Sequence, residues 1–174
     1  MRRYVIALGS LALFLILGAT RANAQASDSQ RFVVRVPTVL SITAPSAEVA
    51  ITHDGTDNDQ IFPDQQWIVR GNADAGVTVV FSTDQAFTQS GGDKRDAQLQ
   101  LAVGGSQGPA TWTVTASSDQ TDYASGDEVA TVAASSDDAG LAQLDITMIF
   151  KTVTFGTFES GDYSLTLTGT VTEN

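Results

Sequence analysis

The chain has 174 residues, of which 20 are Asp or Glu, nine are Lys or Arg, one is His and none is Cys. The absence of cysteine excludes disulfide bonds, thiol nucleophiles and a lipoprotein anchor. The acidic balance argues against binding to nucleic acid or anionic lipid, both of which attract basic surfaces, and a single histidine without cysteine argues against a transition metal.

The first 24 residues have the three parts of a secretory signal peptide. Arg2 and Arg3 form a positive start, residues 5–19 are an apolar run without charge, and residues 22–24 read Ala-Asn-Ala. This order is typical of a cleaved signal, and the apolar run is shorter than the roughly 20 residues of a membrane span. We therefore expect cleavage after Ala24 and an exported protein without a membrane span, located in the periplasm, at the cell surface or outside the cell.

Residues 25–174 are expected to form a single domain with six basic and 20 acidic residues, a formal net charge of −14. Apolar residues alternate with Thr, Ser, Gln and Asp, which is the period of half-buried strands. The predicted strands cover residues 31–36, 39–43, 48–52, 66–71, 77–81, 99–103, 112–114, 128–133, 144–150 and 163–171. Together they predict an all-β fold, an Ig-like antiparallel β-sandwich of about nine or ten short strands.

The same alternation predicts which side chains are buried, because register determines which face of a strand points inward. Both tryptophans are in phase with apolar neighbours, so we interpret them as core residues rather than platforms for sugar stacking. The predicted core is Phe32, Val34, Trp67, Val79, Phe81, Leu99, Leu101, Trp112, Val114, Leu144, Ile146, Met148, Tyr163, Leu165 and Leu167.

Catalytic motifs are not recognisable in the sequence. His53 is the only histidine, and no Gly-x-Ser-x-Gly elbow is present to expose a nucleophilic serine. We interpret His53 as a surface residue in a turn and predict that the protein is not an enzyme, with no catalytic or cofactor-binding residues. A hydrolase that uses loop carboxylates remains an alternative, because spacing along the chain does not show which carboxylates meet in space.

Residues 53–59 form the densest acidic loop, with Asp54, Asp57 and Asp59 within six positions. Calcium takes six to eight oxygen ligands, and loops rich in Asp and Asn supply them. These three aspartates are therefore the candidate metal ligands; no cofactor is expected, and calcium is the single candidate. The other interpretation is a solvated acidic turn, since the order of residues does not match an EF-hand loop.

Two segments of the chain carry a family resemblance. Residues 32–42 read Phe-Val-Val-Arg-Val-Pro-Thr-Val-Leu-Ser-Ile, and residues 161–171 read Gly-Asp-Tyr-Ser-Leu-Thr-Leu-Thr-Gly-Thr-Val. Both resemble segments of bacterial fimbrial-type subunits and of spore-coat-U-like secreted proteins. The resemblance implies an Ig-like β-sandwich whose final strand is introduced by Gly-x-Tyr, and a role in surface structures.

Three functions follow as hypotheses. The first is an exported, non-enzymatic surface or extracellular structural protein, similar to a pilus or coat subunit, with itself or other envelope proteins as partners. The second is a β-sandwich module that binds a carbohydrate or another ligand, assisted by calcium at Asp54, Asp57 and Asp59. The third is the hydrolase. A nucleic-acid partner is not expected in any of them.

Overall fold

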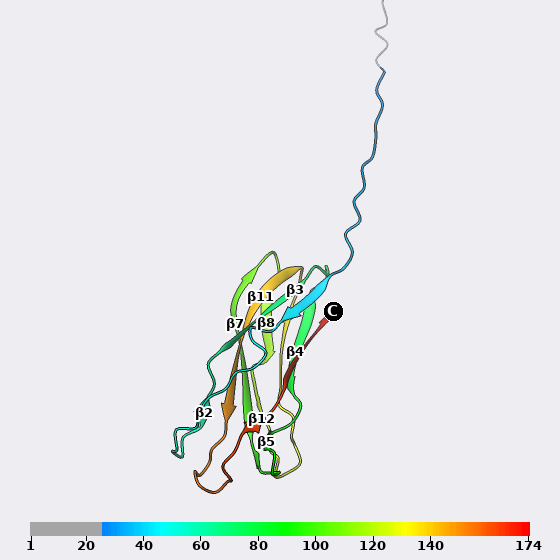
Figure 1. Cartoon of the computed structure of the whole chain (residues 1–174). Helices are drawn as coiled ribbons and strands as arrows, with labels where there is room; N and C mark the ends of the chain where they lie inside the picture. Colours follow the sequence, from blue (N-terminus) through cyan, green and yellow to red (C-terminus); the bar gives the residue numbers. More distant parts are fainter. Residues whose placement is uncertain (1–25) are drawn as a thin grey trace, which may run out of the picture. The chain divides into compact units, whose positions relative to one another are not determined.

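The computed structural model describes residues 26–174, so the predicted signal peptide lies outside the described residues. The described chain contains thirteen strands and no helix (Figure 1). The strands are Leu40–Thr43 (β1), Gln60–Ile61 (β2), Gln65–Gly71 (β3), Val77–Thr83 (β4), Phe87–Gln89 (β5), Lys94–Arg95 (β6), Ala97–Gln107 (β7), Trp112–Ala116 (β8), Ser118–Gln120 (β9), Thr131–Ser136 (β10), Gly140–Phe150 (β11), Tyr163–Ser164 (β12) and Leu167–Glu173 (β13). Within this range no helix is long and apolar enough to cross a membrane.

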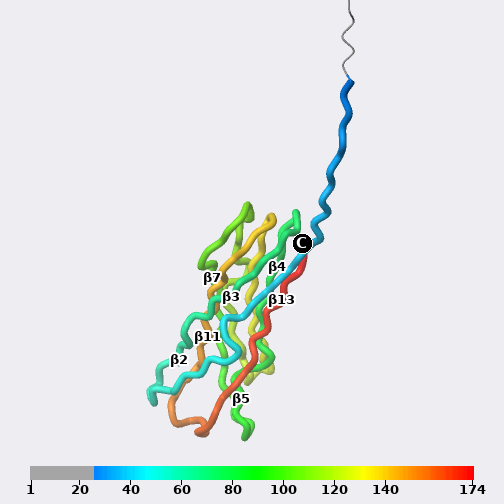
Figure 2. The backbone as a smooth tube through the Cα atoms, turned by 45° about the horizontal axis from the view of Figure 1, so that its top comes forward, coloured from blue at the N-terminus to red at the C-terminus, as the bar shows by residue number. Residues whose placement is uncertain are grey.

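The strands form three antiparallel sheets. The largest has the order β1-β3-β11-β7-β9, with β2 also paired to β11, and the second has the order β13-β4-β10-β8. A small third sheet, β12-β5-β6, is built mainly from a hairpin. Figure 2 shows β3, β11 and β7 in one layer and β4 and β13 in the other. The predicted all-β antiparallel sandwich is confirmed, although five of the thirteen strands have only two or three residues.

The core lies between the inner faces of the two larger sheets. Along β4 the side chains of Val77, Val79 and Phe81 are buried, while the residues between them are partly exposed. On β11 Leu144 and Ile146 are buried on the facing sheet. This burial follows from the pleat, which sends alternate side chains to opposite faces of a strand.

Thirteen of the fifteen predicted core residues pack in this core. Val79, Phe81, Leu99, Leu101, Leu144, Ile146 and Met148 are buried. Trp67, Trp112, Val114, Tyr163, Leu165 and Leu167 are partly buried and pack against them. Phe32 and Val34 were predicted to be buried and are not, since 83% and 87% of their surface is exposed. Alternation shows that two residues share a face, but it does not show that a second layer covers that face.

Two of the predicted strands do not form in the described chain. Residues 31–36 and residues 48–52 alternate in sequence, yet neither segment pairs with a sheet. The predicted strand at 163–171 is divided into β12 and β13, which pair with β5 and β4 respectively. A strand needs a partner for its backbone groups, and the sequence pattern says nothing about that partner.

The chain divides into two units, Met1–Arg35 and Val36–Asn174. The described part of the first unit, residues 26–35, has no secondary structure and is exposed throughout. The second unit holds every strand and the whole core of the described residues 26–174. The predicted single domain of residues 25–174 therefore stays a prediction, while the sandwich itself is built from Val36–Asn174.

Candidate functional site

The acidic loop at residues 53–60 is bonded to the segment that follows β11. Lys151 Nζ forms an ion pair with Asp59 Oδ2, and the backbone N–H of Thr152 donates to Asp59 Oδ1 over 2.9 Å. The backbone N–H of Phe155 donates to Asp57 Oδ1 over 2.7 Å. Two of the three predicted calcium ligands therefore hold one loop against another.

Asp54, the third predicted ligand, is bonded within its own loop. Its Oδ1 accepts hydrogen bonds from the Thr56 hydroxyl over 2.7 Å, the Thr56 backbone N–H over 2.9 Å and Gln60 Nε2 over 3.0 Å. The hydrogen bonds from Thr56, side chain first and then backbone, lower the pKa of the Asp54 carboxyl from its ordinary value. Asp54 thus serves as the acceptor that shapes the turn.

The three aspartates do not converge on one point. Among residues 26–174 no three His, Asp or Glu side chains gather closely enough to hold a metal ion. Calcium binding by Asp54, Asp57 and Asp59 stays a prediction, and it would require the loop to exchange its hydrogen bonds to Thr152 and Phe155 for metal ligation.

Calcium is expected to stabilise the protein no more than sodium does at matched ionic strength. Screening of the acidic surface acts over about 10 Å at 0.1 M salt and needs no specific site. The measurement is a melting curve in CaCl₂ and in NaCl, repeated on Asp57→Asn. If calcium is present at 100 times the dissociation constant of a specific site, its binding would raise the free energy of unfolding by about 2.7 kcal/mol. A calcium-specific rise in melting temperature that Asp57→Asn abolishes would contradict this expectation.

His53 is half-buried rather than a surface residue. Its Nδ1 accepts the backbone N–H of Gly55 over 3.0 Å, so Nε2 carries the proton and donates to Thr152 Oγ1 over 2.9 Å. The ring stacks on Phe155 at a centroid distance of 5.0 Å and meets the edge of Phe150 at 5.9 Å. These contacts make His53 part of the packing between the two loops.

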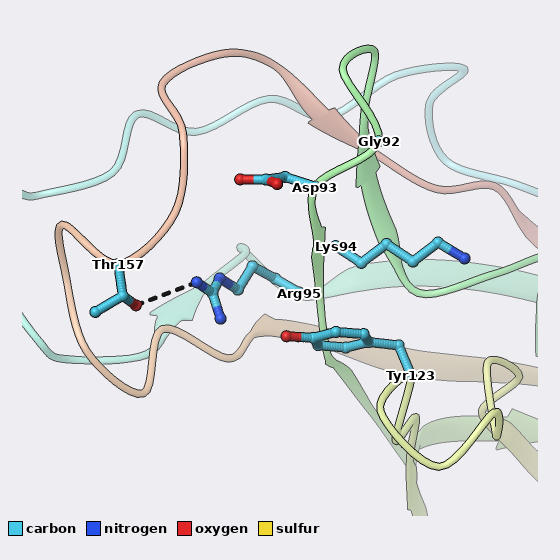
Figure 3. Close-up of a pocket in the computed structure, with 6 residues that line it drawn as sticks. All are labelled: Gly92, Asp93, Lys94, Arg95, Tyr123 and Thr157. Carbon is cyan, nitrogen blue, oxygen red and sulfur yellow. Dashed lines mark hydrogen bonds between the residues drawn. The ribbon is translucent and has the colours of Figure 1, made fainter.

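A pocket of about 300 Å³ lies beside the hairpin of β5 and β6. Figure 3 shows its lining, which comes from the hairpin, the turn after β9 and the segment after β11. The lining residues are Gly92, Asp93, Lys94, Arg95, Tyr123 and Thr157. The sequence contains one signal for this pocket, the Lys94-Arg95 pair, which is the only adjacent basic pair in residues 25–174 and matches no binding motif.

Arg95 is the central side chain of this pocket. Its guanidinium carbon lies 4.4 Å from the centroid of the Phe158 ring, and its Nη2 donates to Thr157 Oγ1 over 3.2 Å. Its Nε is buried and has no hydrogen-bond partner within the described part of the chain. No carboxylate of residues 26–174 forms an ion pair with it. Arg95 thus lies over an aromatic ring, and its side chain makes one hydrogen bond in the described chain.

The other charged residues of the pocket have partners. Lys94 Nζ pairs with both oxygens of Glu128 at 2.5 and 2.6 Å. Asp93 Oδ2 accepts the backbone N–H of Glu159 over 2.8 Å and the Tyr163 hydroxyl over 3.4 Å. Burial first, and then the Asp93 carboxylate, raise the pKa of the Tyr163 hydroxyl above its ordinary value.

A second hollow, of about 400 Å³, contains two carboxylates, Asp64 and Asp145. The Thr147 hydroxyl donates to Asp64 Oδ1, and Gln66 Nε2 donates to Asp145 Oδ1 over 3.2 Å. Asp64, just before β3, therefore already accepts from β11, and Asp145 of β11 already accepts from β3. This hollow therefore adds no further catalytic carboxylate to the hydrolase hypothesis, which stays a prediction.

No family model matches the chain, and the searches of curated proteins and of solved structures found no significant match. The resemblance to fimbrial-type and spore-coat-U-like proteins is not tested by these comparisons and stays a prediction.

Proposed function

We propose that this protein is an exported, non-enzymatic structural subunit that assembles with further copies of itself outside the cytoplasm. One observation carries the proposal, namely the exposure of the N-terminal apolar segment, defined here as residues 31–39. The predicted signal peptide at residues 1–24 supports export.

The N-terminal apolar segment presents an apolar face to solvent. Phe32, Val34 and Val36 are alternate residues, which point to the same side of an extended chain. They are 83%, 87% and 76% exposed. Val33 and Val39, on the other side, are also exposed. Burial of each such side chain contributes about 1.5–3 kcal/mol, and contiguous exposed apolar surface marks sites of interaction. Covering the segment with another surface would therefore bury these apolar side chains and stabilise the complex.

The backbone of residues 31–36 also lacks pairing, whereas Pro37 and Val39, at the end of the segment, are hydrogen-bonded to Asn72. Residues 31–36 belong to none of the three sheets of the described chain. An extended segment obtains its hydrogen bonds most readily at the open edge of a sheet, whose own N–H and C=O groups are unpaired. The alternation of apolar residues matches this mode, because one face would point into a core and the other to solvent.

Charge favours a second copy as the partner. The segment carries Arg31 and Arg35 and no acidic residue, whereas Val36–Asn174 contains four basic and 19 acidic residues, a formal charge of −15. Opposite charge steers association and selects partners. The sandwich of another copy therefore offers the complementary acidic surface.

Among the edge strands, β8 suits the segment best. It pairs only with β10 in the described structure, and its Trp112 and Val114 side chains are only partly buried. At the other edge of the same sheet, Ile42 of β1 already lies against Gly169 of β13. The proposal therefore puts the segment of one copy beside β8 of the next.

Assembly is expected to depend on the face of the segment that carries Phe32 and Val34. Mature protein should form oligomers that grow with concentration in light scattering, whereas Phe32→Asp/Val34→Asp should remain a monomer. Val33→Asp is the matched control, because it adds a charge on the opposite face and should still assemble. Oligomers should weaken as NaCl is raised, since salt screens Arg31 and Arg35 from the acidic sandwich.

A monomeric wild-type protein at every concentration up to its solubility limit would refute the assembly proposal. If Val33→Asp and Phe32→Asp/Val34→Asp lose assembly equally, the partner does not cover only the face that carries Phe32 and Val34, and this part of the proposal is refuted. Melting curves of all variants establish that the sandwich remains folded, and cross-linking mass spectrometry tests for contacts between the segment and β8.

Export is expected to leave a mature protein that begins at Gln25. The charged start, apolar run and Ala-Asn-Ala end of residues 1–24 provide the features that signal peptidase recognises. N-terminal mass spectrometry of protein purified from its native cells measures this directly. An intact Met1 on that protein would show that the segment is not removed.

A further inference from the structure

We propose that the pocket lined by Asp93, Arg95, Tyr123 and Thr157 binds a neutral saccharide through two neighbouring hydroxyl groups. This pocket shares no residue with the N-terminal apolar segment. The inference therefore goes beyond the assembly role and does not depend on it.

The size and shape of the pocket suit a small ligand. Its volume of about 300 Å³ lies at the lower end of the range typical of ligand pockets. In Figure 3 the Tyr123 ring lies beside the Arg95 side chain, and Asp93 lies on the opposite side of Arg95. An aromatic ring with a polar tip packs against an amphipathic ligand and also hydrogen-bonds to it.

The pocket combines unused donors with an unused acceptor. A guanidinium has five N–H donors, and the Arg95 side chain makes one hydrogen bond, to Thr157, among the described residues. Tyr123 uses its backbone for hydrogen bonds, with its N–H donating to Asp96 Oδ1 over 2.9 Å and its C=O accepting from Gly126 N–H over 3.3 Å, which leaves its hydroxyl for a ligand. Asp93 uses Oδ2 for Glu159 and Tyr163, so Oδ1 is available.

A sugar hydroxyl needs this combination, because each hydroxyl both donates and accepts a hydrogen bond. Two adjacent hydroxyls can donate to the Asp93 carboxylate and accept from the Arg95 guanidinium, and hydrogen bonds to charged groups are the stronger kind. The Nε of Arg95 is buried and lacks an acceptor among residues 26–174, so a ligand would bond to the terminal nitrogens of the guanidinium rather than to Nε.

Arg95 is also held in place before a ligand arrives. Stacking on Phe158 and the hydrogen bond to Thr157 restrict its side chain. A side chain that is already ordered loses less conformational entropy on binding, which favours affinity. The contacts of Arg95 thus hold the loop of Thr157 and Phe158 and also order the guanidinium in the pocket. The Tyr123 hydroxyl, by contrast, makes no hydrogen bond in the described chain.

Charge selects a neutral ligand over an anionic one. Lys94 points away from Arg95 in Figure 3 and pairs with Glu128, while the Asp93 carboxylate offsets the charge of Arg95. The surrounding unit, Val36–Asn174, carries 19 acidic and four basic residues. Such a field repels carboxylated or phosphorylated ligands.

The test is a glycan array of neutral and sialylated oligosaccharides probed with the mature protein. The neutral oligosaccharide with the highest signal is then titrated by NMR, with the amide signals of Gly92 and Thr157 as the readout. We expect neutral glycans to bind and these two amides to shift. Tyr123→Phe should weaken binding about fivefold, as loss of one hydrogen bond does, and Arg95→Gln by more than about tenfold.

Arg70→Gln is the matched control, because it removes a guanidinium from an exposed residue of β3 outside the pocket. It should bind as the wild type does. If Arg95→Gln does not fold, Tyr123→Phe decides, since it removes only a hydroxyl. Binding of sialylated glycans alone, no binding of any neutral glycan at millimolar concentration, or unchanged affinity in Tyr123→Phe would each overturn the proposal.

Discussion

Phe81→Ala is expected to lower the free energy of unfolding by about 3–5 kcal/mol, as truncation of a buried phenylalanine does. Phe81 is completely buried on β4 and meets the edge of the Trp67 ring on the opposite sheet at a centroid distance of 5.2 Å. It also lies against Gly169 of β13. Alanine would leave a cavity between the two layers, because backbone on both sides prevents the sheets from closing over it.

Chemical denaturation of the mature protein measures this loss. Phe155→Ala is the matched control, since Phe155 is 47% exposed and contacts only the loop residues His53 and Phe158 among its aromatic neighbours. Its replacement should cost only about 1 kcal/mol. Similar losses in the two variants would show that Phe81 does not join the layers as the structure indicates.

Gly76→Ala is expected to destabilise the protein by about 2–4 kcal/mol. Gly76 ends the turn between β3 and β4, where its N–H donates to Ala73 O over 3.0 Å, and its φ is +77°. A left-handed conformation costs a side chain about 1–2 kcal/mol. A Cβ there would also lie 2.1 Å from the backbone oxygen of Ser136, which cannot move aside without distorting β10.

Gly126→Ala separates the two causes. Gly126 has a φ of +88°, but a Cβ at that position meets nothing within 4 Å. Its replacement should therefore cost only the conformational part, about 1–2 kcal/mol, in the same denaturation experiment. Equal losses at the two glycines would mean that the strands around Ser136 relax and that the close approach carries no penalty.

Local pattern was enough to predict most of the sandwich. On β4 and β11 the alternation of residues correctly predicted which side chains face the core. Val79, Phe81, Leu144 and Ile146 are all buried. The reason is that the pleat of a strand is a local property with a period of two residues. The same rule failed at Phe32 and Val34, because burial also requires a facing layer, and the pattern of a segment contains no information about one.

The acidic loop shows the corresponding limit for the candidate sites. Its composition predicted where carboxylates gather, but not their partners. Asp57 binds the backbone of Phe155, 98 positions further along the chain, and Asp59 binds Lys151 and Thr152. A carboxylate close to a backbone N–H accepts a hydrogen bond without any metal, so the same residues hold two loops together.

The sequence by itself determined the acidic charge, the absence of cysteine, the signal-like start and the strand periodicity, because each is a property of neighbouring residues or of their sum. Only the tertiary structure decided that Arg95, Tyr123 and Thr157 line one pocket and that Asp57 and Asp59 bind the segment after β11. Both outcomes depend on which distant segments meet. Strand pairing and layer packing join residues far apart in the chain, and local periodicity is the same whichever partner is chosen.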